Sequence, residues 1–298
     1  GMHPHNSLMI SLNASEGNHM HANGISMELY GKGYVLGPDA GIGLFLYSGL
    51  DYAEYYSQFP SHNTVCVDGI SSYPVMKSNH SFDLLSCFPA SAEPGTSVTY
   101  SQVAFREPES RADQTRLMGI VTTGPETGYY VDVFRSRKER GGDKMHDYFY
   151  HNLGQTMTLT AADGTDLNLQ PTEELAFAGA HLYAYSYLYD KKVATTGQDV
   201  KVTFTIDMKD KGGDDISMNL WMKGEPEREV FTALSPMTEG LSRTPHMPYN
   251  IKEQPTLTFV ARQHGEAWNR PFVAVYEPST QKEPSAIQSV SYFDAEEP

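Results

Sequence analysis

Short runs in which apolar and polar residues alternate recur along almost the whole chain. The clearest run is 201–208, where alternation is clean, as expected for a strand with one face in the core and one in solvent. Residues 25–36 predict a hairpin, because a turn at Gly31-Lys32-Gly33 separates two strand-like runs. Further strands are expected at 63–68, 98–106, 115–123, 129–135, 145–151, 156–160, 182–189, 216–222, 229–233, 256–261, 272–276 and 287–293.

No long amphipathic helix is predicted between these strands. Residues 50–59 are rich in aromatic side chains and indicate an aromatic loop or a short helix. Strands at this density imply two large antiparallel sheets packed face to face. We therefore predict an all-β fold: one extended β-sandwich domain over residues 1–298, with a subdivision near residues 160–175 as the alternative.

Composition agrees with this fold and narrows the function. The 19 Tyr, 13 Phe, 25 Gly and 18 Pro suit many short strands joined by turns. No apolar run reaches the length of about 18 residues that a membrane span needs. The formal net charge of −15 argues against a nucleic acid partner, because phosphate binding requires a basic face. Cys66 and Cys87 lie on apolar segments, and a disulfide and two free thiols both remain open.

Two histidine motifs and one aspartate form a candidate metal site. His19 and His21 point to the same face if they lie on a strand, because side chains alternate there. Asp39 follows the apolar run 34–36, and His62 precedes the strand-like run 64–67. Imidazole and carboxylate groups suit zinc. The histidine pair, Asp39 and His62 can therefore meet at a metal if the strands are adjacent, and otherwise they are ordinary polar residues at sheet ends.

Three stretches carrying these residues resemble the heparinase II/III-like polysaccharide lyases, a group that includes alginate and oligoalginate lyases. Residues 18–30, 33–41 and 61–69 contain, in order, the motifs H-x-H, D-x-G and H-N-T-V. Family members join an N-terminal α/α toroid to a C-terminal antiparallel β-sandwich that opens with this motif. Very few residues precede the motif here, so the resemblance implies the C-terminal sandwich portion without its toroid. Asn23 is a departure, since the family often has Asp at that position.

The resemblance also implies a chemistry and a metal. These lyases remove the C5 proton of a uronic acid and expel the 4-linked sugar. By this resemblance His21, Asp39 and His62 match the ligands of Zn²⁺, and His19 matches a catalytic residue on the sandwich side. A catalytic tyrosine is placed in some relatives between the aspartate and the last histidine, where this chain has Tyr47, Tyr52 and Tyr56. Tyr47 is the preferred candidate, from its distance before His62.

The implied substrate is an acidic polysaccharide or oligosaccharide, with glycosaminoglycans and alginate both open. The implied location is periplasmic or secreted, and the partner is the toroid. The excess of negative charge means that the toroid would have to supply much of the positive cleft.

A later stretch, 128–151, also resembles the family and contains His146 and His151. Each could contact substrate or could be a histidine on a strand, bonded to a neighbour.

Two other functions fit the same residues. The first alternative is a non-catalytic carbohydrate-binding or structural β-sandwich that keeps the metal. The second is an iron oxygenase with two histidines and one carboxylate as ligands, since His21, Asp39 and His62 also satisfy that count.

Overall fold

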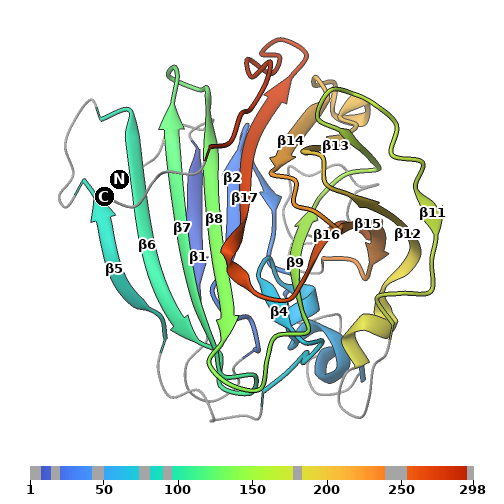
Figure 1. Cartoon of the computed structure of the whole chain (residues 1–298). Helices are drawn as coiled ribbons and strands as arrows, with labels where there is room; N and C mark the ends of the chain where they lie inside the picture. Colours follow the sequence, from blue (N-terminus) through green and yellow to red (C-terminus); the bar gives the residue numbers. More distant parts are fainter. Residues whose placement is uncertain are drawn as a thin grey trace.

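The computed structural model describes residues 8–14, 21–41, 50–73, 81–89, 96–176, 183–238 and 254–293. The regular structure there is almost entirely β-strand, arranged in three antiparallel sheets (Figure 1). The largest sheet has eight strands in the order β10-β13-β14-β17-β8-β7-β6-β5. Its strands are β5 (Asp83–Phe88), β6 (Val98–Arg106), β7 (Ala112–Thr122), β8 (Gly128–Lys138), β10 (Thr156–Ala161), β13 (Val200–Ile206), β14 (Ile216–Met222) and β17 (Ala267–Thr280).

The layer that faces the eight-stranded sheet consists of two separate sheets. The sandwich therefore has two layers, as expected, but three sheets. A six-stranded sheet has the order β11-β12-β15-β16-β9-β4, and a three-stranded sheet has the order β1-β2-β3. Figure 1 shows β1 behind β7 and β8, and β2 behind β8 and β17. The six strands are β4 (Val65–Val67), β9 (Met145–Asn152), β11 (Gln170–Pro171), β12 (Tyr189–Thr196), β15 (Arg228–Ser235) and β16 (Thr256–His264). The three are β1 (Met9–Asn13), β2 (Ser26–Gly31) and β3 (Tyr34–Gly37).

Strand periodicity explains the core between the layers. In β13 the alternate residues 200, 202, 204 and 206 are buried, and the residues between them are partly exposed. Phe204 packs on Tyr150 of the facing sheet, with ring centroids 5.5 Å apart. Both large sheets combine strands from before and after residues 161–175.

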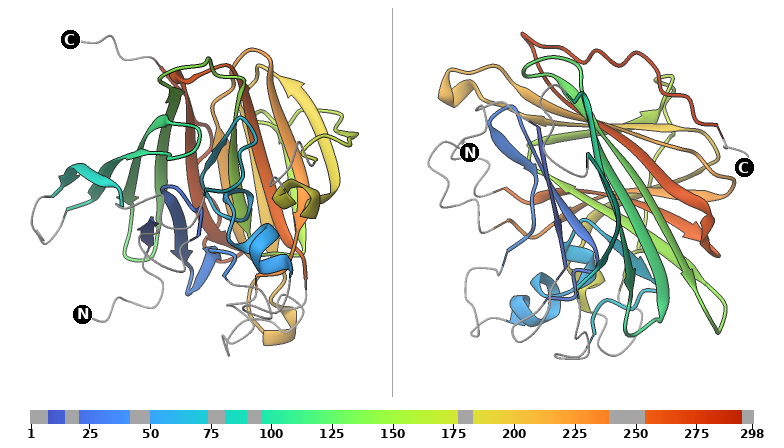
Figure 2. Two further views of the ribbon diagram at one scale, coloured as in Figure 1. Left: turned by 90° about the horizontal axis from the view of Figure 1, so that it is seen from below. Right: turned by 90° about the vertical axis from the view of Figure 1, so that its left-hand side faces the viewer.

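The outer face of the six-stranded sheet is also covered. Phe149 of β9 points away from the inter-sheet core, and it joins a second apolar cluster with Phe231 and Val260. The cover consists of three short helical segments: η1 (Tyr52–Tyr56), η2 (Phe59–Ser61) and η3 (Tyr183–Tyr187). Figure 2 shows η1 in blue beside η3 in yellow, and the rings of Tyr55 and Tyr187 stack 5.5 Å apart. A fourth segment, η4 (Lys209–Lys211), follows β13.

Two predicted strands are wrong. Within 182–189, the described residues form η3, and β12 begins only at Tyr189. The apolar residues of this segment suggested a strand. Tyr185 and its neighbours are instead buried in the second cluster, where a short helical segment buries them equally well. Residues 287–293 form no strand. Instead, the Glu277 carboxylate accepts hydrogen bonds from the amides of Ala286 (2.9 Å) and Ile287 (3.4 Å).

Three described strands escaped prediction, namely β1, β5 and β11, together with most of β12. Strand β5 is exposed along most of its length, so it lacks the alternation that marks a half-buried strand. The two cysteines do not form a disulfide: Cys66 is buried and Cys87 is exposed. Within the described residues, no helix has the length and apolar character needed to cross a membrane.

Candidate metal centre

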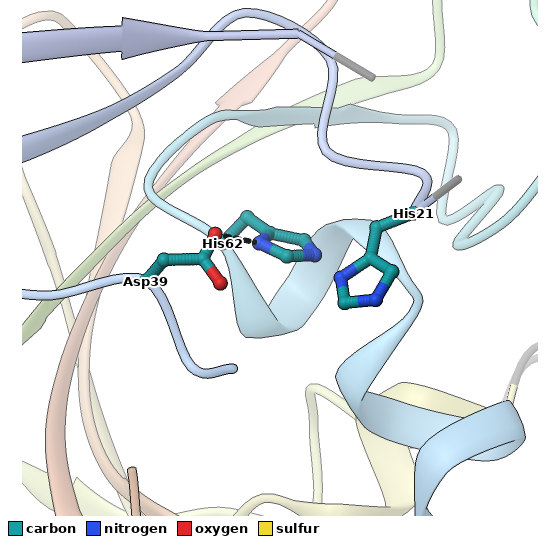
Figure 3. Close-up of side chains that lie close together, drawn as sticks. All are labelled: His21, Asp39 and His62. Carbon is teal, nitrogen blue, oxygen red and sulfur yellow. Dashed lines mark hydrogen bonds and ion pairs between the residues drawn. The ribbon is translucent and has the colours of Figure 1, made fainter. Parts of the chain in front are cut away.

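The candidate metal ligands come from three segments that meet where the three-stranded sheet adjoins the six-stranded one. His21 precedes β2, Asp39 follows β3, and His62 lies between η2 and β4. One ligand atom from each lies within 4.8 Å of the others (Figure 3). The sequence predicted His21 on a strand, but it lies in an irregular segment before β2; Asp39 and His62 lie beside strands as expected, and the structure brings all three together.

A hydrogen bond joins two of the three. The Nδ1 atom of His62 lies 2.7 Å from Oδ2 of Asp39, whose other oxygen accepts the Gly41 amide at 2.9 Å. The side chain of His62 is fully buried, whereas that of Asp39 is 29% exposed. Burial by itself would raise the pKa of Asp39, but the neighbouring His62 and the Gly41 amide lower it to about 2. Asp39 is therefore a carboxylate at neutral pH.

His21 is held as a neutral imidazole. Burial, and next the proximity of His62, lower the pKa of His21 to about 4, although Asp39 acts in the opposite direction. The backbone around it is fixed, because the Tyr73 hydroxyl donates to the His21 carbonyl (2.8 Å) and the Ala22 amide donates to the Ser57 carbonyl (2.8 Å). A neutral imidazole has the free lone pair that a metal requires.

One buried atom indicates that a metal fits here. The Nε2 atom of His62 is buried and has no hydrogen-bond partner among the described residues. Figure 3 shows it facing the ring of His21, whose centroid is 5.4 Å from that of His62. An unsatisfied buried polar atom costs about 1–3 kcal/mol, and a metal ion would remove that cost. Two imidazoles and a carboxylate are a donor set that zinc accepts.

Of the two described tyrosines weighed for catalysis, Tyr52 lies beside this cluster. Its ring meets that of His21 edge-to-face, with centroids 5.6 Å apart. Tyr56 is buried and donates its hydroxyl to the Met237 carbonyl at 2.8 Å, which is a structural role. The two residues preferred for catalysis, His19 and Tyr47, lie outside the described residues.

His146 and His151 are both buried strand histidines. His146 contacts Ser136 (2.9 Å) and Asp143 (2.7 Å), and His151 contacts Asn63 (3.1 Å). Both are therefore strand histidines bonded to a neighbour, as one of the two interpretations expected, and the buried Nε2 atom of His151 has no hydrogen-bond partner among the described residues.

Two polar side chains near the centre were not predicted. Glu28 of β2 accepts the Asp39 amide at 3.1 Å, and Asn63 bonds to the segment before Asp39. Asn63 stands in the H-N-T-V motif, and Glu28 stands at a strand position. Neither position by itself reveals the bond.

Comparison with known proteins identifies the family. A sequence model described as "Heparinase II/III-like, C-terminal" matches residues 5–167, more than half of the chain. The chain belongs to this family. It is also 30% identical over 290 residues to a protein of Formosa agariphila named "Endo-acting ulvan lyase", an alignment that covers 92% of this chain and 34% of the relative. The chain thus spans about a third of the length of that relative.

The structural comparison also matches two solved structures of a heparinase III, one with methylated lysines. Each superposes with a TM-score of 0.49 and 11% sequence identity. They cover 94% and 95% of this chain, and this chain covers 35% and 36% of theirs.

Proposed function

We propose that this chain is the C-terminal β-sandwich part of a polysaccharide lyase that cleaves a uronic-acid-containing polysaccharide by β-elimination. The observation that carries the proposal is the meeting of His21, Asp39 and His62 within 4.8 Å, in a member of the heparinase II/III-like family. The relative named as an ulvan lyase makes ulvan the first substrate to test. A polymeric substrate also favours a periplasmic or secreted enzyme.

Zinc is the proposed metal, held by His21, Asp39 and His62. Bound there, it would supply a fixed positive charge and would tie together three segments that are distant in sequence. The protein itself prepares the site, because burial keeps His21 neutral and His62 together with Gly41 keeps Asp39 ionised.

The elimination requires three catalytic roles, and this chain would provide only some of the groups that fill them. The substrate carboxylate must be neutralised, a base must take the C5 proton, and an acid must protonate the leaving oxygen. We assign one proton transfer to His19 and keep Tyr47 as the candidate tyrosine. Tyr52 is a second candidate, because it lies beside His21. The remaining groups are assigned to the part of the longer relative that this chain does not cover.

A direct assay tests this division of labour. The purified chain is incubated with ulvan, heparan sulfate, chondroitin and alginate, and absorbance of the unsaturated product is followed. We expect little or no turnover by this chain and robust turnover by a form that includes an N-terminal toroid, abolished by His19→Ala. Robust turnover by the chain alone would refute the division, and no product from the longer form would refute the lyase.

Metal analysis separates the alternatives. The chain is equilibrated with equal concentrations of zinc and iron, and its bound metal is measured. One zinc per chain in wild type, and none in the His62→Ala variant, would support the proposed centre. Preferential loading with iron would favour the oxygenase reading, which uses the same ligands. A non-catalytic carbohydrate-binding sandwich would retain zinc and bind the polysaccharide, but the longer form would give no unsaturated product.

A further inference from the structure

The side chain of Asn63 uses its full hydrogen-bonding capacity inside the protein. It is 1% exposed. Its amide donates to the carbonyls of Met27 (3.0 Å) and Pro38 (3.1 Å), and its oxygen accepts from the backbone amide of His151 at 2.6 Å and faces His151 Nδ1 at 3.1 Å. A primary amide offers two donors and two acceptor sites, so all four are engaged.

These bonds join segments that belong to different sheets. Met27 lies in β2 and Pro38 follows β3, both in the three-stranded sheet, whereas Asn63 leads into β4 of the six-stranded sheet. No ladder of paired strands connects the two sheets in the described part of the chain. Their relative position at this point therefore depends on individual hydrogen bonds.

The location of the bonds decides what they control. Pro38 directly precedes Asp39, and Asn63 directly follows His62, so one side chain links the residues next to two ligands. The Asn63 carbonyl adds a link to the third segment. It accepts from Nη1 of the buried Arg116 at 2.7 Å, and the same nitrogen donates to the carbonyl of Ile25, four residues after His21, at 2.7 Å.

We propose that Asn63 is the positioning residue of the metal centre, holding the Asp39 segment against the His62 segment before any metal binds. The proposal rests on the function proposed above in treating the cluster as a metal site. Asn63 does not ligate the metal. It fixes the distance between two ligands, so that binding does not have to order them.

The decisive variant is Asn63→Asp, which preserves shape and the acceptor toward His151. It replaces the amide donor with an oxygen that faces the carbonyls of Met27 and Pro38, so both bonds are lost. Asn219→Asp is the matched control. Asn219 is also buried, at 5% exposure, and donates to the Glu277 carbonyl (3.2 Å) and Ser279 Oγ (3.0 Å), but it lies in β14 of the eight-stranded sheet.

Two measurements are compared across wild type and both variants. Hydrogen exchange of the metal-free protein in EDTA should be faster over residues 36–41 in Asn63→Asp and unchanged there in Asn219→Asp. Zinc affinity from chelator competition should fall about 10–100-fold in Asn63→Asp and stay within about threefold in Asn219→Asp.

The outcomes distinguish this inference from the metal function. If Asn63→Asp exchanges like wild type over residues 36–41, or if Asn219→Asp shows the same increase there, the inference is wrong. If wild type binds no zinc, the proposed metal centre falls, while the exchange result still decides the role of Asn63. Should Asn63→Asp fail to fold, Asn63→Ser, which removes the same donors without adding charge, is judged by the same exchange criterion.

Discussion

The Nδ1 atom of His62 lies 2.7 Å from Oδ2 of Asp39, which settles the direction in which the imidazole presents its other nitrogen. Asp39 is ionised, since its pKa is lowered to about 2, and a carboxylate can only accept. Nδ1 must therefore donate its proton to Asp39. In the neutral ring the lone pair is then on Nε2, the atom that faces His21 (Figure 3). Asp39 thus orients His62 as well as offering a ligand oxygen.

Removing the charge of Asp39 should weaken zinc binding while the protein stays folded. We expect Asp39→Asn to lower zinc affinity about 10–100-fold, because the amide orients His62 less firmly and is a poorer ligand. Competition with a zinc-binding dye measures the change. Asp113→Asn is the control, since Asp113 is a partly exposed residue of β7 that pairs with Arg106. Equal affinities for Asp39→Asn and wild type would exclude a role for Asp39 in the centre.

Stability should depend on metal through His62. With zinc at about 100 times its dissociation constant, binding stabilises the folded chain by about 2.7 kcal/mol, and a chelator should remove that gain. Thermal melts with and without EDTA should therefore differ for wild type and coincide for His62→Ala. His264→Ala, which changes an exposed histidine paired with Glu229, should keep the chelator response. If the melting temperature of wild type is the same with and without EDTA, the metal does not stabilise the fold.

Acid should destabilise the metal-free protein in part through His146. Burial lowers the pKa of His146, although Asp143 acts in the opposite direction. The unfolded chain, with a histidine pKa near 6.5, then binds a proton that the folded chain resists. The free energy of unfolding must fall as pH decreases below about 6.5. Urea unfolding in EDTA at pH 7.5 and 5.5 should show a smaller fall for His146→Gln than for wild type, and equal falls would disprove this assignment.

Removing only one partner of the buried ion pair between Arg116 and Asp132 should destabilise the fold strongly. Both side chains are fully buried, with Arg116 Nη2 2.6 Å from Asp132 Oδ2. Arg116→Met leaves an unpaired buried carboxylate and should lower the free energy of unfolding by about 3–5 kcal/mol. The double variant Arg116→Met/Asp132→Leu should be more stable than the single one in urea unfolding. A double variant less stable than the single would mean that the hydrogen bond from the Tyr148 hydroxyl to Asp132 (2.6 Å) outweighs the cost of the unpaired charge.

The two thiols should differ sharply in reactivity. Cys87 is exposed on β5, whereas Cys66 is buried in β4 and burial raises the pKa of its thiol. A thiol reagent should label one cysteine rapidly in the native chain and two in denaturant. The Cys87→Ser variant should then show almost no rapid labelling. Two rapidly reacting thiols in the native chain would show that the β4 region opens.

The local pattern of the sequence determined the positions of many strands in this protein. The bounds of β6 and β14 could be read from the chain, and so could the alternation of β13, because a strand with one buried face repeats every two residues. The candidate ligands were also visible, since H-x-H, D-x-G and H-N-T-V are local motifs. Exposed β5 escaped this reasoning because its residues do not alternate in burial. The apolar residues of η3 were assigned to a strand, although they pack as a short helical segment on the outer face of the six-stranded sheet.

Tertiary structure alone decided how the site is built. The contact of Asp39 with His62 crosses 23 positions and two sheets, and the burial that lowers the pKa of His21 comes from folding. Asn63 makes the same point, since its four hydrogen bonds go to three residues on segments that only packing brings together. Sequence specifies which groups a chain carries and the period of each strand. Distances between groups on separate sheets are set by long-range packing, which no local pattern encodes.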